Sequence, residues 1–283
     1  MNKVVIVTDS ACDLSLEIMQ KYNIIFLPLT VDLGGKVYKD KIEIDNATFY
    51  EAIKDKSLFP KTAQITPFNF EQVFKEELAK GNEIVCITLS SELSGTNSAA
   101  NIAKGTLDSD KIHVIDSRTV CLGEGYLVKL AAEMAKEGVS AIEIIECIEK
   151  LIENLDTIIT FDTMEMLKRG GRISPAKAAI GGILGIKPML TITNGALEPV
   201  GKAKGKKVAV KEMVQYLKDK NVDLSKTIMV AHSNDIEGSE KLAETLKTEF
   251  NAPDIMILEI GPVVGTHAGP GALAIFFIRK STS

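Results

Sequence analysis

The sequence contains no apolar run long enough to cross a membrane. A spanning helix needs roughly 20 consecutive apolar residues, whereas the N-terminal sequence MNKVVIVTDS has only the short run Val4 to Val7 before Thr8. That run is also too short for the core of a signal peptide, and it suits a first β-strand. We therefore expect a cytoplasmic protein without a membrane span.

A surplus of positive charge is missing as well. The 283 residues include 33 Lys and Arg against 38 Asp and Glu, which gives a formal net charge of -5. Proteins that bind the phosphate backbone do so with clustered Lys and Arg. This balance therefore predicts that nucleic acid is not a partner.

The patterns of disulfide proteins and metal sites are equally absent. The four cysteines are widely separated and form no CxxC pair: Cys12, Cys86, Cys121 and Cys147. This spacing predicts reduced, mostly buried thiols. The three histidines, His113, His232 and His267, lie too far apart in sequence to indicate a metal by their spacing. We expect neither a metal nor a cofactor.

Apolar runs and helical patterns alternate through the first half of the chain. Short β-branched runs occupy residues 4–7, 24–29, 84–89 and 112–115, and their alternation with helices favours a parallel sheet covered by helices. Gly34-Gly35 in VDLGGKVYKD indicates a small hairpin at residues 30–40, outside that sheet. We assign residues 1–160 to an N-terminal α/β/α domain.

The second half mixes helices and strands without a regular alternation. A helical segment, MEMLKRGGRIS, follows an apolar run at 158–161, and Asn194-Gly195 marks a turn. Two strand candidates, TIMVAHS and DIMILEIG, flank an amphipathic helix at 236–250. We assign residues 161–283 to an α+β domain, which packs closely on the first because no low-complexity linker separates them.

The segment IVCITLSSELSGTNSAANIAK, residues 84–104, places a group of hydroxyls at the start of a predicted helix. Ser94, Gly95 and Thr96 stand where the first backbone N–H groups of a helix lack partners, and such termini bind carboxylates and phosphates. Ser94 either caps the helix or helps to bind an anion.

A catalytic interpretation of the same segment is also open. Ser94 would be the nucleophile, with His267 as its base and Asp9 or Asp116 as the residue that orients the imidazole. SELSG differs from the G-x-S-x-G elbow that exposes the serine of α/β-hydrolases. The sequence therefore disfavours a serine-dependent hydrolase.

Three further residues stand in unusual local sequence. Thr62 lies in the polar segment KTAQITP and, taken alone, is a loop threonine. Arg172 follows Gly170-Gly171, whose backbone freedom can hold a guanidinium against a carboxylate. His267 lies in GTHAGPG, which indicates a rigid turn that fixes the direction of the imidazole. His113 and His232 are interpreted as structural.

A glycine-rich apolar segment is the last feature of note. It comprises residues 178–186, followed by Met189 and Leu190. Small residues let elements approach closely or leave a channel between them, so the segment forms either ordinary core or the wall of a tunnel.

Five motifs together resemble those of the DegV family, also called fatty acid-binding FakB proteins. They occur in the family's order and spacing over essentially the full length: TDS at 8–10, SSELSGT at 90–96, LKRGGRIS at 167–174, IKP at 186–188 and GTHAGPGALA at 265–274. The resemblance implies a two-domain DegV-like fold with a ligand tunnel near the domain junction. One long-chain fatty acid would occupy that tunnel.

The resemblance also implies which residues hold the carboxylate. Thr62, Ser94 and His267 match the family's carboxylate-binding network, Gly95 supplies the helix terminus beside Ser94, and Arg172 matches the arginine of the GGRI turn. The family often has serine where this chain has Ala63, so one hydroxyl is missing from that loop.

A carrier rather than an enzyme is what the resemblance implies in function. FakB-type proteins deliver the carboxylate to a separate ATP-dependent fatty acid kinase, and the acyl phosphate enters bacterial phospholipid synthesis. Basic residues are candidates for the kinase-docking rim, and the alternative for the lysines among them is a simple solvated face: Arg172, Lys202, Lys204, Lys206 and Lys207. A likeness to the substrate-binding part of dihydroxyacetone kinases leaves a hydroxyketone-binding protein as an alternative, although the sequence has no phosphate-binding loop.

Overall fold

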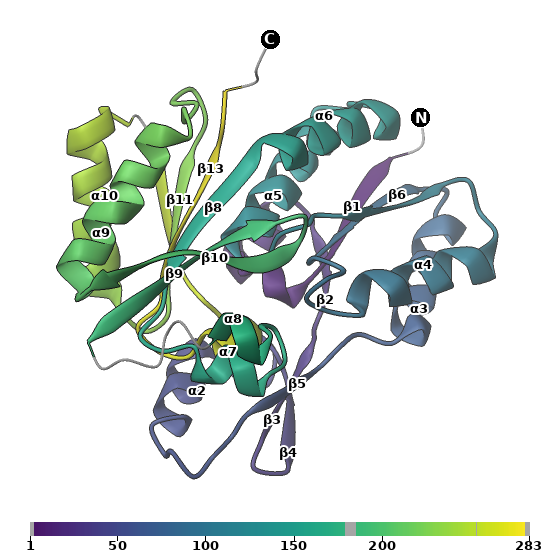
Figure 1. The fold of residues 1–283 in the computed structure, drawn as a ribbon. Coiled ribbons are helices and arrows are strands. Elements are labelled where there is room, and N and C mark those ends of the chain that lie inside the picture. The colour runs from purple at the N-terminus through teal and green to yellow at the C-terminus, as the bar shows by residue number, and fades with distance from the viewer. Residues whose placement is uncertain (1–2, 179–184, 253, 281–283) are drawn as a thin grey trace.

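The computed structural model describes residues 3–178, 185–252 and 254–280 of the protein. Three β-sheets organise these residues: a parallel sheet of four strands, an antiparallel sheet of three and a mixed sheet of six. Figure 1 shows the two larger sheets beside one another, with the small sheet at one end of the molecule.

The first sheet has the strand order β2-β1-β6-β7, and every neighbouring pair is parallel. Each of its strands lies on one of the four runs predicted from the sequence, although β2 is shorter than its run: β1 (Val4–Asp9), β2 (Ile25–Leu27), β6 (Glu83–Thr88) and β7 (Ile112–Asp116). All of β1 is buried, because helices cover both faces of the sheet and a doubly covered strand reads as a continuous apolar run.

Helices pack on both faces of this first sheet. On one face lie α3 (Pro67–Ala79) and α4 (Thr96–Leu107), and on the other lie α5 (Leu122–Lys136) and α6 (Ala141–Asn154). The short helices η1 (Ser10–Cys12) and α1 (Leu16–Lys21) connect β1 to β2. The α/β/α arrangement predicted for this part of the chain is confirmed.

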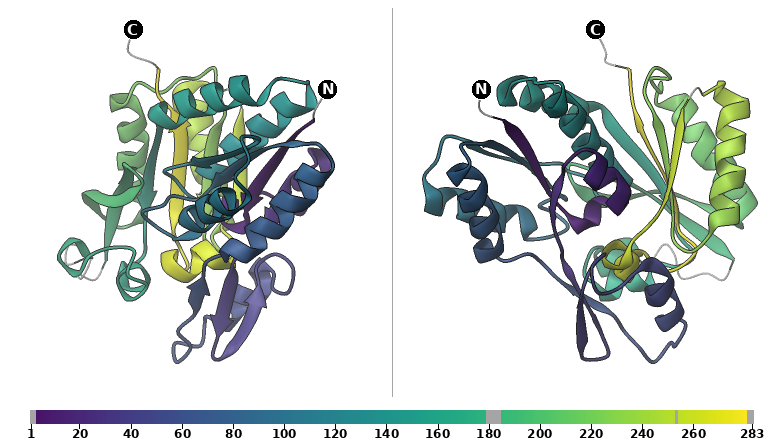
Figure 2. Two further views of the ribbon diagram at one scale, coloured as in Figure 1. Left: turned by 90° about the vertical axis from the view of Figure 1, so that its right-hand side faces the viewer. Right: turned by 180° about the vertical axis from the view of Figure 1, so that it is seen from behind.

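The small sheet contains the predicted hairpin and one strand that the sequence did not reveal. β3 (Thr30–Leu33) and β4 (Lys36–Lys39) pair across Gly34-Gly35, and both glycines have positive φ. β5 (Lys61–Ala63) joins the other edge of β3, so Thr62 lies in a strand and not in a loop. Helix α2 (Asn46–Ala52) connects β4 to β5. Figure 2 shows the small sheet projecting from the molecule in two further views.

The second large sheet has the strand order β10-β9-β8-β13-β11-β12. The bounds of its strands are β8 (Leu155–Thr160), β9 (Ile186–Thr193), β10 (Ala196–Lys204), β11 (Ile228–His232), β12 (Ile255–Glu259) and β13 (Leu273–Ile278). The predicted turn at Asn194-Gly195 joins β9 to β10, and both of its residues have positive φ. Helices α9 (Lys206–Asp219) and α10 (Ile236–Phe250) pack against this sheet.

Helix α5 is the layer that joins the two larger sheets. It contacts β1 and β6 of the first sheet and β11 and β13 of the second. Two glycines permit this close packing, since a Cβ atom at Gly125 would overlap the carbonyl oxygen of Cys12 and one at Gly123 would lie 2.7 Å from the Phe276 ring. The contact brings the two halves of the chain together.

The division of the chain at residue 160 stays a prediction. A division that follows the sheets would place β8 with the second half, because this strand pairs with β13 and β9.

Among the cysteines, Cys12, Cys86 and Cys121 are buried and Cys147 is half-buried, which agrees with the predicted mostly buried thiols.

None of the helices in the described part of the chain has the length and hydropathy that a membrane-crossing helix requires. Within the same ranges, no three side chains of His, Cys, Asp or Glu are grouped in a way that fits a metal ion.

Candidate functional site

A cavity of about 340 Å³ lies where the small sheet, the two larger sheets and helix α11 (Pro262–Ala268) meet. Most of its lining is apolar and comes from segments far apart in the chain, among them Leu89, Val120, Ile159, Val263 and Phe276. Small-molecule sites typically measure about 300–1,000 Å³ and combine apolar walls with a few polar groups. The cavity fits that description.

The predicted site residues gather at this cavity. Thr62, Ser94, Arg172 and His267 all line it, and Gln64 adds one further polar side chain. Gly95 lies directly beside it, because a Cβ atom at Gly95 would overlap the Gln64 side chain. Segments separated by up to 205 residues in sequence thus contribute to one polar wall.

Thr62 and His267 form the central contact of this wall. Their Oγ1 and Nε2 atoms are 2.9 Å apart. Pairing with Val31 in β3 fixes the backbone of Thr62. His267 belongs to the last turn of helix α11 (Pro262–Ala268) and not to the predicted turn. The prediction of a turn at His267 was wrong because the glycine-rich turn begins only after the helix, at Gly269, which has a φ of 68°.

Burial determines the charge of His267. Loss of solvent, with a smaller contribution from the positive charge of Arg172, lowers the pKa of the imidazole to about 4. Nδ1 is buried and has no hydrogen-bond partner among the described residues. The imidazole is therefore neutral near pH 7. When its Nε2–H donates to Thr62, the threonine hydroxyl hydrogen remains available for an anion.

Gly170 is the residue that makes room for His267. It ends helix α7 (Glu165–Arg169), and α7 packs against α11. A Cβ atom at Gly170 would overlap Nδ1 of His267. The sequence drew attention to Gly170 only as part of a flexible turn, so its contact with the imidazole was missed.

Ser94 does not cap helix α4. The N-cap position is held by Gly95, which has no side chain to cap the helix. Ser94 Oγ instead accepts a hydrogen bond of 3.3 Å from the backbone N–H of Thr96 and lies 3.0 Å from Thr96 Oγ1. The capping interpretation was wrong in detail, and the serine stands half-buried at the cavity with the helix terminus beside it.

Arg172 ties the α7 turn to the loop that carries Ser94. Gly171 adopts a φ of 72°, after which Arg172 Nε donates to the carbonyl of Leu93 at 3.0 Å and Nη1 to that of Gly170 at 2.6 Å. Partial burial lowers the pKa of the guanidinium from its ordinary value. Arginine carries five N–H donors, more than these two carbonyls use.

The described residues do not assemble the alternative catalytic triad. His267 contacts Thr62 and not Ser94. Asp9 accepts hydrogen bonds from backbone N–H groups, and Asp116 accepts them from the neighbouring 91 and 118 positions. These contacts favour an anion-binding role for the hydroxyls over nucleophilic catalysis.

The remaining sequence interpretations have mixed outcomes. His113 contacts Glu83 at 2.9 Å and His232 accepts from a backbone N–H, so both have structural partners. Met189 and Leu190 are buried in apolar clusters and do not line the cavity. Of the glycine-rich segment proposed as core or tunnel wall, residues 179–184 lie outside the described part of the structure.

We expect His267 to destabilise the ligand-free protein as the pH falls. The unfolded imidazole takes up a proton near its ordinary pKa of about 6.5, whereas the folded one does so only near 4. Between these values the unfolded state binds more protons, so the free energy of unfolding decreases as the pH is lowered. Urea unfolding at pH 7 and pH 5 should show that the free energy of unfolding decreases more in the wild type than in His267→Gln. Equal losses would contradict the shifted pKa.

This geometry defines a class of protein: an α/β protein with two large sheets and a mainly apolar cavity that has polar side chains on one wall. A family model described as "Uncharacterised protein, DegV family" matches residues 3–280. The chain therefore belongs to the DegV family.

Individual relatives match this chain over nearly the whole length of both proteins. A DegV domain-containing protein of Clostridium perfringens is 39% identical, with 98% of each chain covered. DegV of Bacillus subtilis, described as a fatty acid binding protein, is 32% identical with a TM-score of 0.87, and the match covers 99% of this chain and all of that one. A DegV family protein of Thermus thermophilus, described by its fatty acid binding, is 29% identical with a TM-score of 0.89, at 98% and 100% coverage.

Proposed function

We propose that the protein binds one long-chain fatty acid, with the acyl chain in the cavity and the carboxylate at Thr62, Ser94, Gly95, His267 and Arg172. The observation that carries this proposal is the convergence of these polar groups on one wall of an otherwise apolar cavity. Structural relatives described as fatty acid-binding proteins support it.

The two ends of such a ligand would have separate energetic roles. Each buried CH₂ group contributes about 0.8 kcal/mol, so a long acyl chain contributes on the order of 10 kcal/mol before ordering costs are subtracted. An unpaired buried carboxylate would offset much of that gain. Donors at the head are therefore needed, and Thr62, Ser94 and Arg172 carry them beside the neutral His267.

Binding of a fatty acid and of the fatty alcohol with the same chain tests this assignment. Both ligands bury the same acyl chain, but only the acid presents a carboxylate to the polar wall. Calorimetric titration of the delipidated protein should give at least ten-fold tighter binding for the acid. Equal affinities would place the head group elsewhere, and failure of both ligands to bind would refute the proposal.

Gly170→Ala should weaken fatty acid binding by about ten-fold, to the level of a His267 substitution. The added methyl group overlaps Nδ1 of His267, so the imidazole must turn away from Thr62. Gly105→Ala in helix α4 is the matched control, because no atom lies within 4 Å of the new Cβ there. Titration of both variants decides the matter, and unchanged affinity in Gly170→Ala would mean that the position of His267 is unimportant.

We further propose that the protein is a carrier that presents the carboxylate to an ATP-dependent fatty acid kinase, and that the acyl phosphate feeds phospholipid synthesis. The residues assigned to the head group are half-buried and not fully enclosed, so a partner can approach them. The chain also lacks the sequence of a phosphate-binding loop, and this supports a chemical step performed by another protein.

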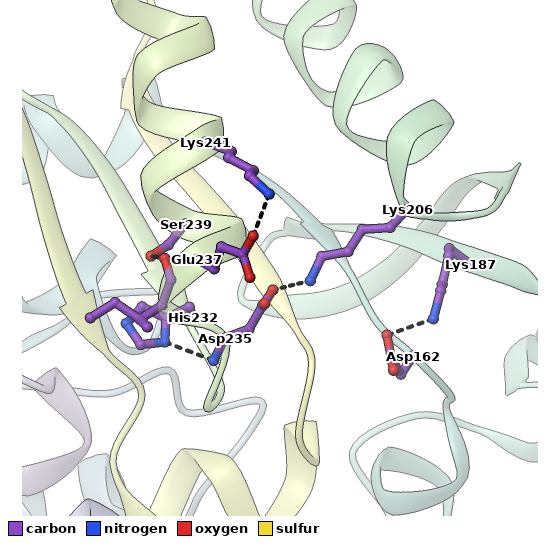
Figure 3. Close-up of polar contacts among 9 residues, drawn as sticks. Asp162, Lys187, Lys206, His232, Asp235, Glu237, Ser239 and Lys241 are labelled. Carbon is purple, nitrogen blue, oxygen red and sulfur yellow. Dashed lines mark hydrogen bonds and ion pairs between the residues drawn. The ribbon is translucent and has the colours of Figure 1, made fainter.

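The basic residues proposed for kinase docking differ in their surroundings. Figure 3 shows Lys206 directed at Asp235, with which it forms an ion pair. Arg172 is engaged with two backbone carbonyls. Lys202 and Lys204 of β10 are exposed, as is Lys207, and none of these three takes part in an ion pair within the described residues.

Charge reversal at Lys204 should slow turnover with a cognate kinase and leave fatty acid affinity unchanged. Exposed rim charges mainly set the encounter rate and its salt dependence, and this side chain does not line the cavity. Lys150→Glu on α6 is a control of the same charge change at another exposed lysine. Steady-state assays at low and high salt should separate the two variants, and identical rates would exclude Lys204 from docking.

A further inference from the structure

The residues of β13 that face the cavity change abruptly in size along the strand. Ala272 precedes the strand, and Ala274 and Phe276 follow at intervals of two residues, so the three side chains point to the same face. All three line the cavity. Two methyl groups thus leave space next to helix α11, and a large ring occupies the next position along the strand.

The neighbouring strand shows that the cavity ends at the level of this ring. Ile159 of β8 lies opposite Ala274 and lines the cavity. Thr157 lies opposite Phe276, and Met229 of β11 flanks the ring on the other side. Neither of these two residues contributes to the lining. Since α11 carries His267 and directly precedes β13, Phe276 closes the end of the cavity remote from the polar wall.

Helix α5 holds the Phe276 ring in place. Phe276 is 1% exposed, and the absence of a side chain at Gly123 lets the helix backbone pack onto it: a Cβ atom there would lie 2.7 Å from the Cδ1 atom of the ring. A ring packed between a helix and a sheet cannot turn aside without displacing one of them. The end of the cavity that Phe276 closes is therefore rigid.

We propose that Phe276 sets the maximum length of the acyl chain that the protein accepts. This inference rests on the proposed fatty acid binding and adds its specificity. The terminal methyl group of a chain that just fills the cavity would contact the Phe276 ring. Each methylene that fits strengthens binding about four-fold, and a chain that extends beyond the ring would lose this gain by overpacking.

A homologous series of saturated fatty acids tests the proposal on the delipidated full-length chain. The wild type should bind more tightly with each added methylene up to an optimum and more weakly beyond it. Phe276→Val shortens the side chain and should move the optimum by about two methylene groups toward longer acids. An acid two methylenes beyond the wild-type optimum should then gain about ten-fold in affinity.

Phe277→Val is the matched control. Phe277 is the next residue of β13, is fully buried, and lies on the opposite face, where it packs against Tyr216. Both substitutions remove the same atoms from the same strand, so both should lower the melting temperature. Only Phe276→Val should move the optimum. The same shift in both variants, or no shift in either, would overturn the proposal.

Ala274→Val provides a test of opposite sign that does not open a cavity. The larger side chain narrows the channel between α11 and Phe276 and should move the optimum toward shorter acids. An unchanged optimum in this variant would overturn the proposal even if Phe276→Val fails to fold. A wild-type protein that binds no acid of the series would instead refute the proposed function itself.

Discussion

His267→Ala and Ser94→Ala should each weaken fatty acid binding by about ten-fold or more while the fold stays intact. Each substitution removes one hydrogen-bonding group from the polar wall of the cavity. A lost hydrogen bond to a charged group costs roughly 1.5–3 kcal/mol, which corresponds to about 10-fold to 150-fold in affinity. Titration of the delipidated variants with one fatty acid measures the effect directly.

Ser91→Ala is the control for the serine substitution. Its hydroxyl belongs to the same loop, but it is exposed and bonded to Asp116, away from the cavity. Ser91→Ala should therefore bind as the wild type does. Wild-type affinity in Ser94→Ala and His267→Ala as well would mean that the carboxylate binds at another place.

Formation of acyl phosphate should depend on this protein and on a cognate kinase together. The protein alone should neither consume ATP nor hydrolyse acyl esters, because the contacts of Ser94 and His267 do not assemble a nucleophile with its base. Kinase, ATP and fatty acid-loaded protein should give acyl phosphate at a rate far above the control that lacks the carrier. Product detection with isotopically labelled fatty acid measures this rate.

Two outcomes would contradict the carrier proposal in different ways. Acyl phosphate at the control rate with several kinases tried would leave a fatty acid-binding protein without the delivery role. ATP consumption by the purified protein alone would assign the chemistry to this chain. The Ser94→Ala variant, loaded at saturating fatty acid, then distinguishes poor presentation of the carboxylate from poor binding.

The sequence predicted the first sheet well because its two central strands, β1 and β6, are buried on both faces. Such strands appear as apolar runs whatever their partners are, as β1 and β6 show. Helix α10 was equally recognisable from its amphipathic period. The three-residue strand β5 was missed, because KTA has no apolar run and becomes a strand only by pairing with β3.

The candidate site was likewise predictable where local sequence motifs mark its residues, and not where its contacts depend on the packing of distant elements. Thr62, Ser94, Gly95, Arg172 and His267 were selected from motifs, and the structure brings them to one cavity wall. The contact of Gly170 with His267 was not predictable from the sequence, because it depends on how α7 packs on α11. The position of Phe276 at the far end of the cavity depends likewise on the packing of α5.

Mass spectrometry of the ligand extracted from the purified protein tests the central claim most directly. An apolar cavity of this size is unfavourable when it is open to water, so cellular lipid should fill it during expression. We predict a fatty acid in a molar ratio near one to the protein, and its loss in the His267→Ala variant after washing. A lipid-free preparation that also fails to bind added fatty acid would contradict the account.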